Sequence, residues 1–170
     1  MCRNVIRCAP IAIADPENEE ARETLSLAAY MITGGIVDQG GSSDMPLHLT
    51  EYGIAAFYEI PHGHGIAILM PRWMQYILSK ETAPTFYRFG VRCLDIPEGM
   101  ETMAGAQATI DALSDWLYNQ LGLESHLAAF GVEESKLHAM AEKALRGKEL
   151  VRGLTDLTLD DVENIFKMCM

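Results

Sequence analysis

The chain has 170 residues, a mass of 18.8 kDa and a formal net charge of −11, from 13 Lys and Arg against 24 Asp and Glu. A chain of this length can bury roughly 70% of its unfolded surface, which is enough for one domain with a substantial core. The acidic balance argues against nucleic acid or an anionic membrane as a partner, because both are bound by clustered Lys and Arg. No apolar run reaches the ~18 residues of a membrane-spanning helix.

The cysteines indicate a reducing environment. Cys2, Cys8, Cys93 and Cys169 include no CxxC pair, and a chain of this size does not need disulfides. The first residues are too polar for a secretory signal, so nothing marks export. We therefore expect free thiols that act as small buried apolar groups in a cytoplasmic protein.

Apolar residues recur at helical spacing along nearly the whole chain, and no alternating strand pattern is longer than four residues. These patterns predict an all-α helical bundle that forms one domain over residues 1–170. Pro71 falls inside one predicted helix and is expected either to kink it or to remove one backbone hydrogen bond. The predicted helices cover residues 17–33, 46–58, 62–77, 82–94, 101–121, 133–145 and the segment from 159, with a loop over 38–44.

Two local signals predict where particular helices end and begin. Gly122 follows the last apolar residue of its helix, in the position where a left-handed glycine commonly ends a helix. Thr158 is followed three residues later by Asp161, which predicts a capping box with Asp in place of the usual Glu.

Three of the five histidines, His48, His62 and His64, lie within residues 48–64. His48 and His62 each begin a predicted helix, so the break at Ile60-Pro61 must turn the second helix across the first if the two rings are to meet. Imidazoles that converge in an apolar pocket are good ligands for Zn(II) or Fe(II). The alternative is that each histidine is a hydrogen-bonded core or cap residue, and spacing alone does not decide between these. The remaining two, His126 and His138, are expected to be exposed.

The same window resembles the C-terminal signature of the iron-containing (group III) alcohol dehydrogenases. His62 follows His48 by fourteen residues, with Ile54-Ala-Ala-Phe-Tyr58 and Ile60-Pro-His-Gly63 between and around them. The stretch 57–74 resembles the butanol dehydrogenase branch in particular. The similarity extends over essentially the whole chain, through residues 3–7, 10–13, 15–16, 20–22, 121–123, 130–132, 141–145 and 159–166.

This resemblance implies the fold of the C-terminal metal-binding domain of the dehydroquinate synthase-like and iron-containing alcohol dehydrogenase proteins. It also implies four metal ligands, an Asp and a His one helical turn apart followed by two later histidines, which His48 and His62 match. The earlier pair is expected upstream of Met1, with an α/β domain that binds the nicotinamide cofactor and has no counterpart in this chain. Asp44 has the right spacing from His48, but Pro46 interrupts the turn between them.

The resemblance further implies the metal-binding half of an NAD(P)-dependent alcohol dehydrogenase that oxidises primary alcohols or reduces aldehydes, such as butanol and butanal. Fe(II) or Zn(II) would act as a Lewis acid on the alcohol oxygen, and NAD or NADP would be bound through the missing domain. Tyr52 is the candidate catalytic residue. It stands where the family usually has a histidine that faces nicotinamide and substrate, and a tyrosine there can donate a hydrogen bond but does not titrate near neutral pH.

Four apolar residues are expected to line the substrate pocket and to suit a short alcohol or aldehyde: Ile54, Phe57, Ile66 and Met70. Two nitrogen ligands make a weak metal site, so the chain is expected to be half of an enzyme: a truncated gene product, a separately encoded subunit or an expressed domain. The expected partners are a second copy, in a homodimer, or a separate nucleotide-binding subunit. One alternative is a catalytically inactive, truncated helical module that folds and self-associates through exposed apolar surface. Another is a regulatory protein that binds metal without redox chemistry.

Overall fold

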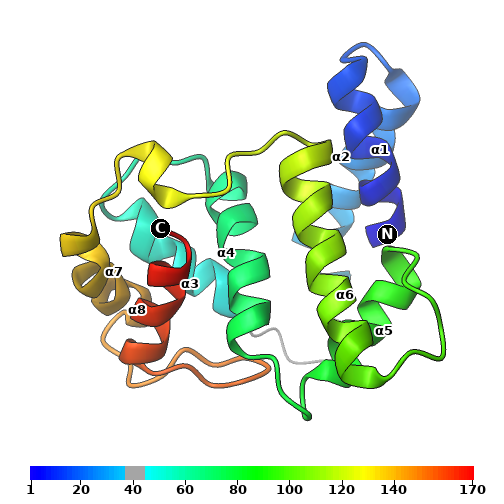
Figure 1. Cartoon of the computed structure of the whole chain (residues 1–170). Coiled ribbons are helices and arrows are strands. Elements are labelled where there is room, and N and C mark those ends of the chain that lie inside the picture. The colour runs from blue at the N-terminus through cyan, green and yellow to red at the C-terminus, as the bar shows by residue number, and fades with distance from the viewer. Residues whose placement is uncertain (37–44) are drawn as a thin grey trace. The chain divides into compact units, whose positions relative to one another are not determined.

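The computed structural model describes residues 1–36 and 45–170, and helices dominate both ranges (Figure 1). Within them the β-type pairing consists of one isolated antiparallel bridge, between Val151 and Leu157, so the all-α prediction is confirmed. The loop predicted over 38–44 lies outside the described residues. The elements are α1 (Cys2–Ala14), α2 (Glu19–Thr33), α3 (Pro46–Ala55), α4 (His62–Tyr76), α5 (Ala83–Cys93), α6 (Thr102–Asp115), the π-helix η2 (Trp116–Gln120), the 3₁₀-helices η3 (Leu127–Phe130) and η4 (Glu134–Lys136), α7 (Leu137–Leu145) and α8 (Leu159–Met168).

Contacts within the chain divide it into two compact units. The first comprises the described residues of Met1–Ser43 together with Ala83–Gly122, and the second those of Asp44–Thr82 together with Leu123–Met170. A single domain over 1–170 therefore stays a prediction. No helix in the described part of the chain is both long enough and apolar enough to span a bilayer.

The first unit contains α1, α2, α5, α6 and η2. The side chain of Asn18 accepts a hydrogen bond from the Ala21 N–H at 3.0 Å, so α2 begins slightly later than the pattern predicts. The Trp116 indole N–H donates to the Ile6 carbonyl at 3.1 Å and ties η2 to α1. The helix predicted over 101–121 is α6 followed by this π-helix, and Gly122 ends it with φ +69°, as predicted.

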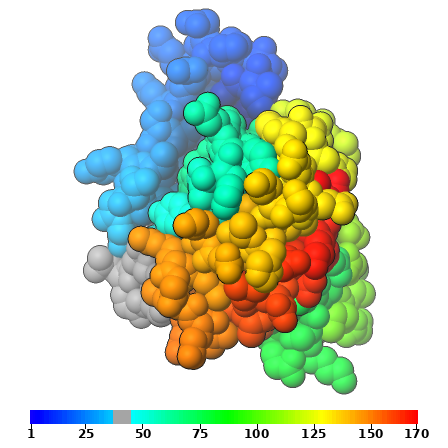
Figure 2. Space-filling view, turned by 90° about the vertical axis from the view of Figure 1, so that its left-hand side faces the viewer, coloured from blue at the N-terminus to red at the C-terminus, as the bar shows by residue number. Residues whose placement is uncertain are grey.

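The second unit packs α3, α4, α7 and α8 around a shared core. Figure 2 shows one face of it, where residues near 140–150, in orange, lie beside α8, in red. Gly53 allows α3 to approach α7 closely, because a Cβ at this position would overlap the main-chain carbonyl of Met140. The core contains the fully buried side chains of Ile54, Ile68, Leu69, Met140, Ile165 and Phe166.

The ends of α4 and α8 are joined by a polar contact. The predicted capping box is present: Thr158 Oγ1 accepts from the Asp161 N–H at 3.3 Å, and Asp161 Oδ2 accepts from the Thr158 N–H at 2.8 Å. The Tyr76 hydroxyl donates to Asp161 Oδ1 at 2.6 Å, and this hydrogen bond raises the pKa of Tyr76. The helix α4 continues past the buried Pro71 to reach this point.

The four cysteines are free thiols, as expected. Cys8 and Cys169 are buried, and burial raises the pKa of the Cys169 thiol to about 12. Cys2 is exposed and Cys93 is half-buried, so the expected buried role does not hold for these two.

An exposed ionic cluster joins α7 to α8. His138 Nδ1 lies 2.7 Å from Glu163 Oε2, and Lys167 Nζ lies 2.7 Å from Glu163 Oε1. The hydrogen bond that His138 donates to Glu163 raises the pKa of His138, and the hydrogen bonds that Glu163 accepts from Lys167 and His138 lower the pKa of Glu163. His138 and His126 are both exposed, as the sequence predicts.

These shifts predict a pH-dependent stability. Because His138 has a raised pKa in the folded state, its protonated form stabilises the fold fully below the unfolded-state pKa of about 6.5, and that contribution is lost as the pH rises through the folded-state pKa. We expect the urea midpoint of the wild type to fall more than that of His138→Gln between about pH 6 and about pH 9. His126→Gln, the control, should keep the wild-type pH dependence. Equal pH dependence in wild type and His138→Gln would contradict this prediction.

Candidate metal centre

The structure brings together the two histidines predicted as metal ligands. The ring centroids of His48 and His62 lie 5.0 Å apart, with their planes inclined at 56°. His48 lies in the first turn of α3 and His62 is the first residue of α4. The non-helical segment before His62, which contains Ile60-Pro61, turns α4 so that both rings meet, as the sequence argument required.

The pair is open to solvent and not enclosed in an apolar pocket, which corrects the sequence expectation. The His62 side chain is 50% exposed and His48 is also exposed. Side chains on a helix lean toward its N-terminus, so those in a first turn project past the helix end and are covered by few neighbours. Within the described residues, the imidazole pair therefore forms a surface site.

Glu51 is a buried residue that contacts His62 of this pair, and the sequence analysis did not predict this contact. Its side chain is 1% exposed, and its Oε2 accepts a hydrogen bond from His62 Nδ1–H at 2.6 Å. This contact orients the ring and leaves Nε2 for another partner. The sequence contained one signal for it: Glu51 comes three residues after His48 and lies on the same face of α3 as the buried Ile54.

Gly65 makes room for the buried carboxylate. A Cβ at Gly65 would lie 2.9 Å from Glu51 Cγ and 3.0 Å from Glu51 Oε1. No hydrogen-bond partner for that Oε1 is found among the described residues. Gly63, two residues earlier in α4, has no such neighbour, because a Cβ there would meet nothing within 4 Å. Close backbone approach therefore explains one of the two glycines around His64.

The third histidine of the window is not part of the pair. His64 Nε2–H donates to the Glu124 carbonyl at 2.9 Å, and its ring packs edge-on against Phe130 at a centroid distance of 4.9 Å. For His64 the hydrogen-bonded structural role is thus the correct interpretation.

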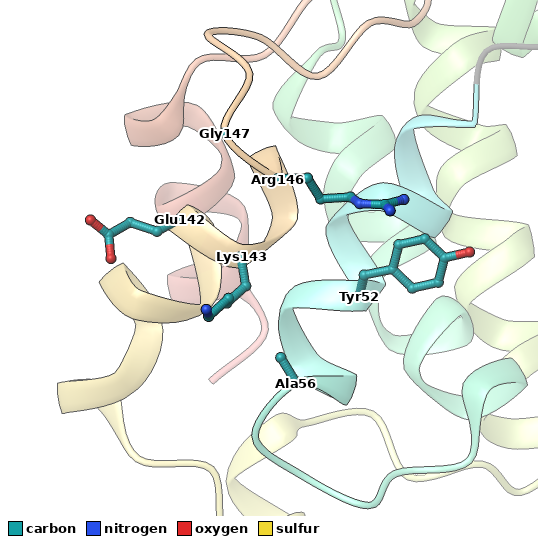
Figure 3. Close-up of a pocket in the computed structure, with 6 residues that line it drawn as sticks. All are labelled: Tyr52, Ala56, Glu142, Lys143, Arg146 and Gly147. Carbon is teal, nitrogen blue, oxygen red and sulfur yellow. The ribbon is translucent and has the colours of Figure 1, made fainter.

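Tyr52 lies one helical turn after His48 and borders a pocket (Figure 3). The Arg146 guanidinium lies over its ring, 5.6 Å from the centroid. The expected apolar lining is not found here: Ile54 is fully buried, and neither it nor Phe57, Ile66 or Met70 lines this pocket. The pocket measures about 610 Å³ and is lined by Tyr52, Ala56, Glu142, Lys143, Arg146 and Gly147.

The residues of the imidazole pair fit part of a metal site. Neutral imidazole nitrogens suit Zn(II) and Fe(II), and a ligating histidine usually donates its second N–H to a carboxylate, as His62 does. In residues 1–36 and 45–170, no group of three or more His, Cys, Asp or Glu side chains is arranged to hold a metal. Asp44, noted for its spacing from His48, lies outside the described residues. The described chain thus offers two nitrogen donors.

Comparison with known proteins decides the family. The profile described as "Fe-containing alcohol dehydrogenase family, C-terminal" matches residues 1–170. The chain belongs to this family. It is 33% identical to the NADH-dependent butanol dehydrogenase B of Clostridium acetobutylicum, over 98% of this chain and 43% of that protein. It is 35% identical to the probable NADH-dependent butanol dehydrogenase 2 of Bacillus subtilis, over 97% of this chain and 43% of that protein. The predicted resemblance to the butanol dehydrogenase branch is confirmed, and the chain spans less than half the length of these curated relatives.

Solved structures confirm the predicted fold. Escherichia coli YqhD superposes with a TM-score of 0.88 at 24% identity, over 99% of this chain and 43% of that one. The NADH-dependent butanol dehydrogenase A of Thermotoga maritima superposes with a TM-score of 0.86 at 25% identity, over 98% of this chain and 43% of that one.

The packing around Glu51 predicts opposite effects of alanine at two nearby glycines of α4. Gly65→Ala should push the carboxylate away from His62 and lower the free energy of unfolding by about 1–3 kcal/mol. Gly63→Ala is the matched control and should raise it by about 0.5–1 kcal/mol, because alanine restricts the unfolded chain and meets no neighbour. Urea unfolding measures both. Similar unfolding free energies for the two variants would mean that Gly65 does not accommodate Glu51.

Proposed function

We propose that this chain supplies the metal-binding half of an NAD(P)-dependent alcohol dehydrogenase that interconverts primary alcohols and aldehydes, such as butanol and butanal. The observation that carries the proposal is the pair of imidazoles supported by the buried Glu51 carboxylate. Membership of the Fe-containing alcohol dehydrogenase family, and relatives named as NADH-dependent butanol dehydrogenases, support the reaction class.

In this proposal His48 and His62 hold two positions of an Fe(II) or Zn(II) ion. The other ligands and the nicotinamide cofactor come from protein beyond the described residues, in a nucleotide-binding domain or a second subunit. A metal held there would supply a Lewis acid for the alcohol or aldehyde oxygen, and the nicotinamide would supply or accept the hydride.

The residues of this chain have three separate tasks in that reaction. The Glu51 carboxylate holds the Nδ1–H of His62 and so orients its Nε2. His48 provides the second nitrogen. Tyr52, one turn along α3 and 44% exposed, donates a hydrogen bond to the substrate oxygen, with its ring held under Arg146.

Metal binding by the isolated chain tests the first part of the proposal. We expect Zn(II) titration, followed by NMR of the histidine rings, to show one weak saturable site that is lost in His48→Ala and in His62→Ala. Glu51→Gln keeps the shape of the side chain but removes its charge, and it should weaken Zn(II) binding by about tenfold or more.

His126→Ala serves as the control, because it removes an exposed imidazole outside the site, and it should bind Zn(II) as the wild type does. Zn(II) binding that survives both ligand substitutions would place the metal elsewhere. A chain that binds no metal would favour the inactive helical module.

Activity tests the second part. The chain combined with the nucleotide-binding domain of a butanol dehydrogenase relative, with Fe(II) or Zn(II) and either NADH or NADPH, should reduce butanal. His62→Ala should abolish this reduction, because it removes a metal ligand. Metal binding without turnover in this reconstituted system would instead support a regulatory metal-binding protein.

A further inference from the structure

Within the first unit, the start of α1 lies beside the end of α5 (Figure 1). The Arg3 guanidinium of α1 forms an ion pair with the Asp95 carboxylate, which follows α5, with Nη2 3.0 Å from Oδ1. Asp95 has φ +55°, in the left-handed region, and the N–H of Ile96 donates to the Gly90 carbonyl at 3.2 Å. These two features are typical of the turn that closes a helix. The end of α5 is therefore a defined turn, and the first turn of α1 is placed against it.

This arrangement brings together two of the four thiols. Cys2 is the first residue of α1 and Cys93 is the last residue of α5. A hydrogen bond joins their two side chains, and burial followed by this neighbouring thiol raises the pKa of Cys93. Cys2 is exposed and Cys93 is half-buried, whereas Cys8 and Cys169 are buried. One thiol of the contacting pair is thus open to solvent.

The contact is suited to forming a disulfide. Two thiols that share a hydrogen bond need only a small movement to bond, because a disulfide holds its Cβ atoms roughly 4 Å apart. Packing does not account for the pair, since an exposed side chain such as Cys2 gains little as a small apolar group. The raised pKa keeps the Cys93 thiol protonated near neutral pH, so the exposed Cys2 is the sulfur that reacts first with a solute.

We propose that Cys2 and Cys93 are a site of reversible oxidation, at which hydrogen peroxide converts the two thiols to a disulfide. The sulfur of Cys2 attacks the peroxide, an S–O bond forms as the O–O bond breaks, and water leaves a sulfenic acid on Cys2. The sulfur of Cys93 then attacks that of Cys2. The S–S bond forms as the S–O bond breaks, and the departing hydroxide takes the Cys93 proton to give a second water. The two sulfurs lose two electrons in total, and the peroxide gains them.

Thiol analysis of the chain after exposure to peroxide tests this site. The metal-free, reduced chain is treated with hydrogen peroxide, quenched, denatured and alkylated. Two of the four thiols should be lost, and the mass of the chain should fall by that of two hydrogen atoms. Peptide mapping should find Cys2 linked to Cys93 within one chain, and dithiothreitol should restore both thiols.

Substitutions separate the two steps. Cys93→Ser removes the second sulfur, so oxidation should stop at a sulfenic acid on Cys2, which dimedone traps. Cys2→Ser should leave Cys93 reduced under the same exposure, because the accessible sulfur is missing. Cys8→Ala, the matched control, removes a buried thiol of the same helix and should form the disulfide as the wild type does.

The proposal is overturned if all four thiols survive, if the disulfide joins another pair, or if Cys2 instead links two copies of the chain. Equal trapping of Cys2 by dimedone in the wild type and in Cys93→Ser would also overturn it, because Cys93 would then not react with the sulfenic acid. The test uses neither bound metal nor turnover, so its outcome is independent of the proposed function.

Discussion

A buried carboxylate is costly to leave without hydrogen bonds, and Glu51, at 1% exposure, depends on the one that its Oε2 accepts from the His62 ring, because no partner for its Oε1 is found among the described residues. This constraint shapes the surrounding structure. It requires α4 to begin beside α3, and it requires a residue without a side chain at Gly65. It also fixes one ring of an imidazole pair that is otherwise open to solvent. His62 is thus exposed but not free to reorient, which is the condition that a metal ligand needs.

Local patterns were sufficient to predict most helices, because caps and breakers act over a few residues. Thr158 and Asp161 form the predicted capping box, and Gly122 has the predicted left-handed conformation. The proximity of His48 and His62 could be predicted, because two ligands of one metal must lie close together. The pairing of Glu51 with His62 was not, because it depends on how α4 crosses α3, and neither was the exposure of the two rings.

Two chemically different surfaces share the helix α3. At its first turn His48 joins an imidazole pair suited to a metal, and one turn later Tyr52 borders a pocket lined by two cations. The apolar residues expected to line a pocket are instead divided between core and surface, with Ile54 fully buried and Phe57 40% exposed.

The tautomer of His62 tests the central claim most directly. Long-range nitrogen–proton NMR of the metal-free chain at about pH 8, where imidazoles are mainly neutral, reports which ring nitrogen carries the proton. The Glu51 hydrogen bond predicts that Nδ1 is protonated and Nε2 is not, and that this preference weakens in Glu51→Ala. A His62 ring protonated on Nε2 in the wild type would contradict the account, because the nitrogen assigned to a metal would then be occupied.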